Sequence, residues 1–310
     1  MRAGPPERLL VVGAFGVLWL VWGSTFLVAK VAVATIPPLL LVAIRCLLAG
    51  ALTLALPWPS SGKSAPPWGF SLLVGTLLFV GGQGALAAAL ETVPSGVAAL
   101  LGATTPLWMA LFAWLAAREQ RPSTREAVGV VLGLVGMTIL TAPWRVGDAR
   151  TIPLGGVLLV LLSALSWAAG SIVLRSRQGA GTSRRLATAR QFLAGGAVAA
   201  ILAAGRGDLA RVGPEALSPG TAAAVLYLLL FGSLLGFVAY SWLLGRTTAA
   251  RVASYAYVNP LVAIALGWTL GGEAITPRVL VAGAITVTAI ALVVTPPRIP
   301  RPAAGGVAGR

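Results

Sequence analysis

Long apolar stretches separated by short polar segments run along the whole chain. Ten stretches each hold roughly 17 to 26 residues, the length that a helix needs to cross about 30 Å of hydrocarbon. A helix pairs its backbone N–H and C=O groups internally, which lipid cannot do. The pattern therefore predicts an all-α polytopic membrane protein with ten transmembrane helices. The predicted spans are residues 9–29, 38–56, 68–90, 94–117, 126–142, 153–174, 186–204, 219–244, 248–271 and 278–294.

The composition agrees with a membrane protein that has no soluble domain. Hydrophobic residues make up 57% of the chain, charged residues 10%, and the mean hydropathy is +0.90. The first stretch is too long for a cleaved signal peptide, and the second follows closely after it. What remains is short loops and a tail at residues 295–310, which is predicted to be cytoplasmic. The single cysteine, Cys46, excludes an internal disulfide.

Basic residues are distributed unevenly between the two sides of the predicted spans. With the N-terminus in the cytoplasm, 15 Lys and Arg residues fall on the cytoplasmic side and 6 on the outer side. This bias follows the positive-inside rule and predicts a multi-pass protein of the cytoplasmic membrane with both termini in the cytoplasm. The net charge of +15 therefore reports topology and some contact with lipid headgroups. It does not indicate nucleic-acid binding.

The two halves of the chain repeat each other. At an offset of 145 positions, Trp22 corresponds to Trp167, Lys30 to Arg175 and Arg45 to Arg190. At an offset of 154 positions, Pro106 corresponds to Pro260 and Glu119 to Glu273. Each copy holds five spans, at residues 9–142 and 153–294, and an odd number forces the copies into opposite membrane orientations. Such inverted repeats are typical of secondary transporters, which bind their solute near the midplane.

Several segments resemble the EamA family of the drug/metabolite transporter superfamily. The run from Val21 to Phe26 (VWGSTF) is similar to the family's opening motif, and Arg-x-x-Leu-Ala-Gly occurs in the second and seventh spans. The prolines of the fourth and ninth spans, each followed by a glutamate, are similar too. The second copy departs from the motif, since it has Trp-Ala-Ala-Gly-Ser from Trp167. The resemblance implies a ten-helix exporter of amino acids, related metabolites or drug-like solutes, with spans 5 and 10 at the periphery.

Polar and aromatic residues at mid-depth in the spans are candidates for a solute site. Pro106 lacks a backbone N–H and so frees the carbonyl of Gly102, and Pro260 frees that of Ala256. Such kinks are tolerated where a cavity or a neighbouring helix satisfies the freed groups. Interhelical packing is the alternative for each side chain. The predicted substrate-binding residues are Trp22, Arg45, Gln83, Trp108, Tyr240, Tyr255, Tyr257 and Asn259.

Arg45 is an arginine inside an apolar span. At the centre of a helix such a residue costs about 2.5–3.5 kcal/mol on insertion scales, so it is expected to face protein or water. Two interpretations stay open: it hydrogen-bonds a neighbouring helix, or it binds a carboxylate or phosphate of the solute. Lys30, near the end of the first span, is expected to snorkel towards the interface.

The residue types of familiar catalytic and metal sites are missing from the spans. All eight acids lie at span ends, in loops or in a tail, and the chain has no histidine. The sequence therefore predicts no enzyme, no metal and no cofactor, and it offers no obvious proton relay. Glu91, Glu119 and Glu273 remain candidates if they line a wet vestibule. Gly129-x-x-x-Gly133 predicts close helix packing, either inside the molecule or in a homodimer.

Together these features predict a carrier that exports small organic solutes by alternating access. One alternative is an importer or equilibrative exchanger of anionic or phosphorylated solutes that uses Arg45 and Lys30. Another is a non-transporting membrane scaffold. The scaffold has no need of matched kinks and glycine-rich helices at the same depth.

Overall fold

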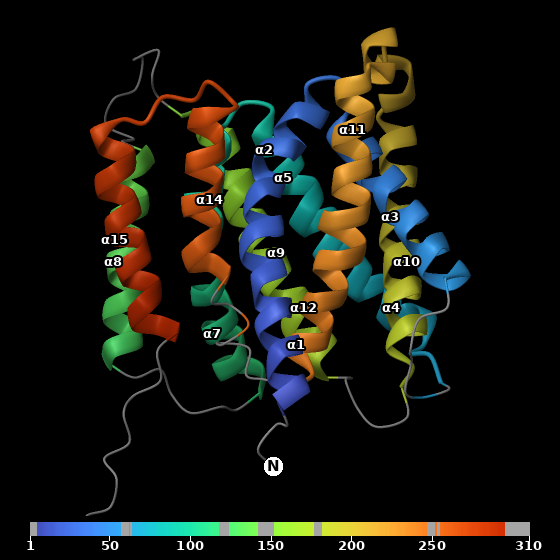
Figure 1. Ribbon diagram of the computed structural model, residues 1–310, viewed down its shortest axis with the longest axis horizontal. Helices are drawn as coiled ribbons and strands as arrows, with labels where there is room; N and C mark the ends of the chain where they lie inside the picture. Colours follow the sequence, from blue (N-terminus) through green and yellow to red (C-terminus); the bar gives the residue numbers. More distant parts are fainter. Residues whose placement is uncertain are drawn as a thin grey trace, which may run out of the picture.

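The computed structural model describes residues 5–56, 62, 64–117, 124–141, 152–176, 182–246, 252 and 255–294. Upright helices dominate it, and the described residues form no strand (Figure 1). The helices of the first half are α1 (Pro5–Gly16), η1 (Val17–Val21), α2 (Trp22–Val33), α3 (Pro38–Ala55), α4 (Trp68–Gly75), η2 (Thr76–Gly84), α5 (Ala85–Leu90), α6 (Ser95–Gly102), α7 (Thr105–Ala117) and α8 (Thr124–Thr141).

The second half continues with the same succession of long helices. Its elements are α9 (Leu154–Ser176), α10 (Arg184–Gly205), η3 (Asp208–Arg211), η4 (Pro214–Leu217), α11 (Pro219–Tyr227), η5 (Leu228–Gly236), α12 (Phe237–Leu244), α14 (Tyr255–Thr269) and α15 (Pro277–Val294). Each predicted span overlaps at least one helix, but a turn at Ala103 and Thr104 interrupts the span 94–117, and part of the span 248–271 lies outside the described residues.

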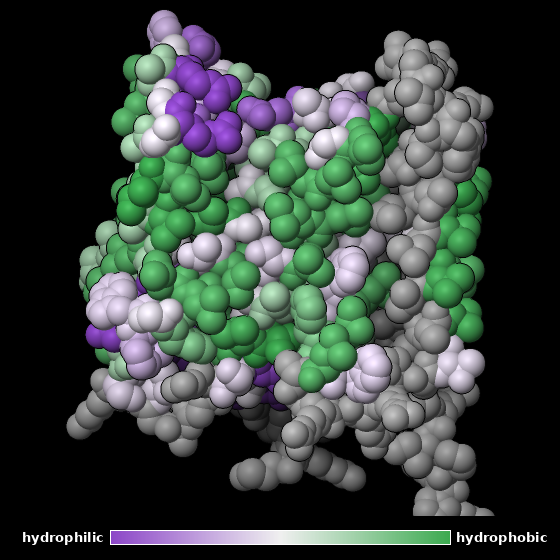
Figure 2. Space-filling view, turned by 180° about the vertical axis from the view of Figure 1, so that it is seen from behind, coloured by the Kyte–Doolittle hydropathy of each residue, from purple (hydrophilic) through white to green (hydrophobic). Residues whose placement is uncertain are grey.

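Within the described part of the chain, seven helical runs are long and apolar enough to cross a membrane. Two shorter apolar helices, Val258–Thr269 and Pro277–Ala289, accompany them. Large apolar side chains such as Leu158, Leu226 and Val281 are exposed on the outside of the bundle. Figure 2 shows a broad apolar band across the middle of one face, with hydrophilic side chains gathered near the upper edge and a lower corner. This surface suits a protein whose middle is solvated by lipid.

Local sequence determines where several helices begin. Pro38, Pro219 and Pro277 each occupy the first position of a helix, where a missing N–H costs nothing. The Ser218 hydroxyl caps α11 by accepting the backbone N–H of Thr221 at 3.3 Å. The hydroxyl of Thr276 accepts the N–H of Val279 at 3.3 Å in the same way. These caps replace hydrogen bonds that the first turn of a helix cannot make.

Corresponding helices of the two halves pack against each other. A side chain at Gly50 of α3 would meet Leu193 of α10, and one at Gly196 of α10 would meet Leu47 of α3. The helices α8 and α15 form a second such pair at one edge of the molecule (Figure 1). Gly133 of α8, the second glycine of the Gly129-x-x-x-Gly133 motif, lies against Leu107 of α7 within the same molecule.

The third helical run of each half contains a π-helical segment of nine residues. These segments are η2 in the first half and η5 in the second. A shorter one, η1, interrupts the first run between α1 and α2. Segments of this kind are uncommon and frequently occur at functional sites. Residues of η2 and η5 line the cavity described next, and η1 ends directly before Trp22, which also lines it.

Candidate functional site

A cavity of about 130 Å³ lies between the helices of the two halves. Its wall combines aromatic and small apolar residues with a few polar groups. None of the described lining residues comes from α8 or α15, the two helices that the resemblance placed at the periphery. The lining residues are Trp22, Thr25, Phe26, Ala29, Arg45, Gly82, Gln83, Leu86, Ala87, Gly102, Thr105, Ser163, Ala164, Trp167, Leu228, Gly232, Tyr255 and Asn259.

An aromatic cluster centred on Trp22 forms one wall of this cavity. The Trp22 ring meets Trp167 edge to face with centroids 5.4 Å apart, and it meets Tyr255 in the same way at 5.3 Å. Tyr240 packs behind it with a centroid distance of 5.1 Å. Such pairs add about 0.5–1.5 kcal/mol each to the effect of burial. The wall is therefore a packed unit contributed by four helices.

Hydrogen bonds fix the orientation of this cluster. The Trp22 indole N–H donates to the carbonyl of Gly232 in η5 at 3.1 Å. The Tyr240 hydroxyl donates to the hydroxyl of Ser171 at 2.6 Å, and the Tyr240 ring is fully buried. A buried aromatic residue whose polar atom has a partner is held in one position. Tyr240 thus supports the wall from behind and does not line the cavity.

Glycines of the π-helical segments let the tryptophans approach the backbone closely. A Cβ atom at Gly82 of η2 would lie 3.0 Å from the Trp167 ring. One at Gly236 of η5 would overlap the Trp22 indole nitrogen. Each half therefore supplies a glycine that receives the tryptophan of the other half.

Arg45 reaches the cavity from α3 and is 6% exposed. The Nη2 atom of its guanidinium donates a hydrogen bond to the hydroxyl of Ser233 at 3.0 Å. Its Nε atom is buried and has no hydrogen-bond partner. None of the described carboxylates forms an ion pair with it. The only partner shown is thus a side-chain hydroxyl of η5.

Gln83 and Asn259 are the amide side chains of the lining. The buried Oε1 atom of Gln83 has no hydrogen-bond partner. With its amide oriented to suit its neighbours, Asn259 donates to the carbonyls of Leu18, Trp19 and Tyr255 at 3.0–3.1 Å. Asn259 therefore ties α14 to the π-helical segment η1, whereas Gln83 keeps an acceptor free.

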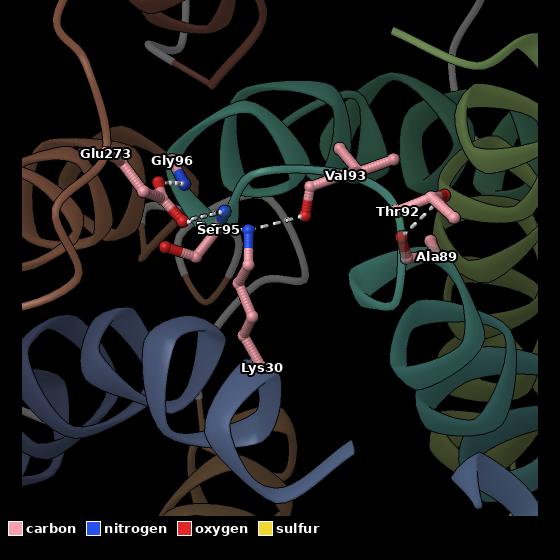
Figure 3. A network of polar contacts seen from close by, with 7 residues as sticks. All are labelled: Lys30, Ala89, Thr92, Val93, Ser95, Gly96 and Glu273. Carbon is pink, nitrogen blue, oxygen red and sulfur yellow. Dashed lines mark hydrogen bonds and ion pairs between the residues drawn. The ribbon is translucent and has the colours of Figure 1, made fainter. Parts of the chain in front are cut away.

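A network of polar contacts, called the latch below, joins Lys30, Val93, Ser95, Gly96 and Glu273 near the ends of α2, α6 and α14 (Figure 3). The Lys30 ammonium lies 3.2 Å from Oε1 of Glu273 and 3.4 Å from the carbonyl of Val93. The same carboxylate accepts the backbone N–H groups of Ser95 at 2.7 Å and Gly96 at 3.1 Å. The helix α6 has no side-chain cap of its own, because Pro94 precedes it. Glu273 supplies that cap from the other half of the chain.

The latch favours the charged form of Glu273. Burial alone would raise the pKa of this carboxyl group. The backbone N–H groups of Ser95 and Gly96 and the ammonium of Lys30 outweigh burial, so the pKa lies below its usual value. The positive end of the α6 dipole acts in the same direction. Glu273 is consequently a poor proton acceptor in this conformation.

Five of the eight predicted substrate-binding residues line the same cavity, namely Trp22, Arg45, Gln83, Tyr255 and Asn259. The other three have different places. Trp108 packs against the hydrophobic core outside the lining, and its indole nitrogen is buried without a partner. Tyr240 lies behind the aromatic wall, and the side chain of Tyr257 lies outside the described residues.

Two further expectations differ from what the structure describes. The carbonyl of Gly102, freed by Pro106, accepts the hydroxyl of Thr105 at 2.7 Å. Lys30 was expected to snorkel, but it is paired with Glu273.

Trp167 was not among the candidates although its offset from Trp22 marked it as the counterpart. No local pattern marked Glu273 as the partner of Lys30. Among the described residues, no group of three metal-ligating side chains comes together.

An apolar helical bundle with a cavity between its two halves is typical of membrane transporters. The EamA-like transporter family profile matches residues 10–142 and again residues 154–295. The chain belongs to this family. It is therefore a transporter and not an enzyme.

Individual relatives agree with this assignment. The chain is 36% identical to the uncharacterized inner membrane transporter YedA of Escherichia coli K12, over 93% of this chain and 91% of the relative. It is 28% identical to the uncharacterized transporter YvbV of Bacillus subtilis, over 99% and 98%. It is 31% identical to a probable amino-acid metabolite efflux pump of Salmonella typhimurium, over 87% and 89%.

A solved crystal structure shares the fold. It covers 91% of this chain and 95% of its own, with a TM-score of 0.62 and 21% sequence identity. At that identity the likeness concerns the arrangement of the helices and leaves the solute unspecified.

Proposed function

We propose that the protein exports small organic solutes across the cytoplasmic membrane by alternating access. The observation that carries this proposal is the cavity that residues from both halves line, with an aromatic wall, a buried arginine and a free amide acceptor. Export is favoured by the relative from Salmonella typhimurium, which is named a probable efflux pump. The solute binds in the cavity, and the two halves rock about it.

The proposed carrier consists of ten transmembrane helices in two inverted repeats, residues 9–142 and 153–294. The exchange of glycine and tryptophan supports this arrangement. Gly236 follows Gly82 by 154 positions, and Trp167 follows Trp22 by 145 positions. Gly82 receives Trp167 and Gly236 receives Trp22, so the two contacts are equivalent under the repeat. A two-fold axis between the halves generates such reciprocal pairs.

In this proposal both termini are cytoplasmic, and the latch of Lys30 and Glu273 lies on the outer side. Lys30 ends the first crossing from the N-terminus, so one span separates it from the cytoplasm. The latch joins the first half to the second and keeps the outer entrance closed. Export requires that it open after the solute has bound from the cytoplasm.

The second candidate is an importer or exchanger of anionic solutes, which Arg45 in the lining favours. The engagement of Lys30 by Glu273 withdraws the second cation that this candidate would use. If the protein imports or exchanges anions, the cavity therefore suits a solute that carries a single negative charge.

The test of export is uptake into inverted, energised membrane vesicles. A panel of amino acids, aromatic cations, nucleosides and phosphorylated sugars is presented, with vesicles lacking the protein as the control. Uptake of at least one solute above that control is expected. Uptake that disappears when the pH gradient is collapsed indicates proton-driven export, and uptake that survives indicates a facilitator. No uptake of any solute, together with accumulation in right-side-out vesicles, would favour the importer.

Alternating access is tested with single cysteines at Gln83 and Asn259 in a Cys46→Ala background. Gln83→Cys is expected to react with a membrane-impermeant thiol reagent from one side of the membrane at a time. When a solute identified in the vesicle assay is added, we expect the cysteine to become accessible from the opposite side of the membrane. Failure of Gln83→Cys and Asn259→Cys to react from either side would contradict a carrier cavity.

A further inference from the structure

The guanidinium of Arg45 is a buried charge without a counter-charge among the described residues. The three ion pairs described elsewhere involve Glu273 and Asp208, and neither acid pairs with Arg45. A buried ion that lacks a partner is strongly unfavourable, because desolvation is not offset by Coulomb attraction. A hydroxyl such as that of Ser233 satisfies one N–H group but supplies no charge. The described residues therefore leave the positive charge of Arg45 unbalanced.

The position of the guanidinium allows a small anion to reach it. Arg45 lines the cavity together with Thr25 and Gly232, and a Cβ atom added at Gly232 would lie 3.6 Å from Nη2. Glycine at position 232 therefore places no side chain against this edge of the guanidinium. A planar guanidinium offers paired N–H groups whose spacing matches the two oxygens of a carboxylate.

The charges around the cavity favour a carboxylate over a phosphate ester. Arg45 is the single cation in the lining that the structure describes. Lys30 is held at the latch by Glu273, so it is not available to a second negative charge. A carboxylate neutralises one guanidinium, whereas a phosphate monoester near neutral pH carries about −1.5 to −2 and would leave an excess buried charge.

The remainder of the lining specifies the other part of the solute. Trp22, Phe26, Trp167 and Tyr255 present apolar and aromatic surface to the same cavity. The free Oε1 atom of Gln83 is an acceptor for an N–H group of the solute.

We infer that the solute is a small carboxylate with an apolar or aromatic body, and that Arg45 binds its carboxylate group. This inference rests on the proposed function, because it takes the cavity as the transport site. The solute restores charge balance at Arg45 while its body packs against the aromatic wall. Arg45 then selects for the acid over any neutral analogue of the same shape.

The experiment compares 3-phenylpropionate with its neutral amide, 3-phenylpropionamide, and with phenyl phosphate. Binding to the purified full-length protein is measured by quenching of tryptophan fluorescence and by calorimetry. The acid is expected to bind about tenfold to a hundredfold more tightly than the amide, as a charge-assisted hydrogen-bonded pair requires. Arg45→Gln is expected to abolish that difference, and Arg45→Lys to retain part of it.

Arg190→Gln is the matched control, because Arg190 is the counterpart of Arg45 in the repeat but lies elsewhere. It donates to the carbonyl of Pro66 at 2.7 Å and stacks on Trp68. This variant is expected to keep the preference for the acid. If Arg45→Gln does not fold, Ser233→Asp replaces it, since a carboxylate at position 233 would pair with Arg45 in place of the solute. Ser233→Asp is expected to raise the thermal stability and to remove acid binding.

Equal binding of acid and amide by the unaltered protein would overturn the inference. So would an acid preference that survives both Arg45→Gln and Ser233→Asp, or tighter binding of phenyl phosphate than of the acid. The vesicle assay separates this failure from failure of the proposed function. Transport of neutral or cationic solutes without acid selectivity leaves export standing and refutes the role of Arg45. Absence of transport for every solute refutes export itself.

Discussion

Trp22 and Trp167 lie 145 positions apart in the sequence, and their rings meet edge to face with centroids 5.4 Å apart. The two residues occupy the same place in the two copies of the repeat. One ring comes from each half of the chain, so this contact joins the two halves. The aromatic wall of the cavity therefore lies at the junction of the two halves, where a solute contacts both.

The Trp22–Trp167 pair is expected to be energetically coupled. A double-mutant cycle of Trp22→Ala and Trp167→Ala should give a coupling free energy of about 0.5–1.5 kcal/mol in detergent unfolding, because each ring loses its edge-to-face partner. Trp22→Ala combined with Trp114→Ala is the control, since Trp114 is an exposed tryptophan of α7. That combination should be additive within about 0.5 kcal/mol. Additivity of Trp22→Ala and Trp167→Ala would contradict the wall as a unit.

The two partners of the latch are expected to contribute unequally to stability. Glu273→Ala leaves the N–H groups of Ser95 and Gly96 without an acceptor and should lower the free energy of unfolding by about 1–3 kcal/mol. Lys30→Met removes one partly exposed ion pair and should cost about 0–1 kcal/mol. Thermal unfolding in detergent measures both.

Glu91→Gln is the control for the latch, because Glu91 is exposed at the end of α5. A surface change of this kind should stay within about 0.5 kcal/mol. A larger loss for Lys30→Met than for Glu273→Ala would show that the ion pair, and not the cap of α6, dominates the latch.

The contribution of Glu273 to stability is expected to depend on pH. Because the pKa of Glu273 is lowered on folding, the contribution is fully present above the unfolded value of about 4.3. It is lost as the pH falls through the lower, folded pKa. The difference in unfolding free energy between the unaltered protein and Glu273→Gln should therefore be constant from pH 7 to about pH 5 and shrink below it. A difference that grew on acidification would mean that the folded pKa is raised.

Close packing of α4 against α10 is expected to tolerate no side chain at Gly75 or Gly195. A Cβ atom at Gly75 would overlap the carbonyl of Gln191, and one at Gly195 would lie 2.6 Å from the carbonyl of Gly75. Backbone atoms cannot move aside, so each Gly→Ala change should cost about 1–3 kcal/mol or more and reduce the folded yield. Gly155→Ala is the control, because a Cβ there meets no atom within 4 Å. It should be neutral or stabilising, since alanine favours a helix.

The hydrophobic pattern predicted most helices well, because the length of an apolar stretch corresponds to the length of helix that crosses the hydrocarbon layer. The predicted span 38–56 corresponds to the helix Pro38–Ala55, and Pro277 begins α15 after the threonine that caps it. The offset of 145 positions between the two copies also identifies Trp167 as the counterpart of Trp22. These features are local or periodic, so single-chain patterns contain them.

The lining of the site was harder to predict, because the core and the lipid are both apolar. Hydrophobicity therefore does not reveal which face of a helix points inward, and Trp108 was assigned to a cavity from which the structure excludes it. The latch joins residues 243 positions apart, and only the folded chain brings Glu273 to the start of α6. The π-helical segments likewise depend on packing that no local propensity encodes.

The two glycine–tryptophan contacts, Gly82 with Trp167 and Gly236 with Trp22, bear on the evolutionary origin of the chain. Each glycine is called the seat of its tryptophan below. If five helices once formed a homodimer, Gly82 and Gly236 were a single position, and so were Trp22 and Trp167. Any mutation there altered both seats at once. In that case, duplication and fusion would have allowed each glycine and each tryptophan to mutate independently of its counterpart. The departure of the second copy from the opening motif, beside Trp167, lies where such freedom would first be used. Neither half alone encloses the cavity, so selection still acts on the two as one unit.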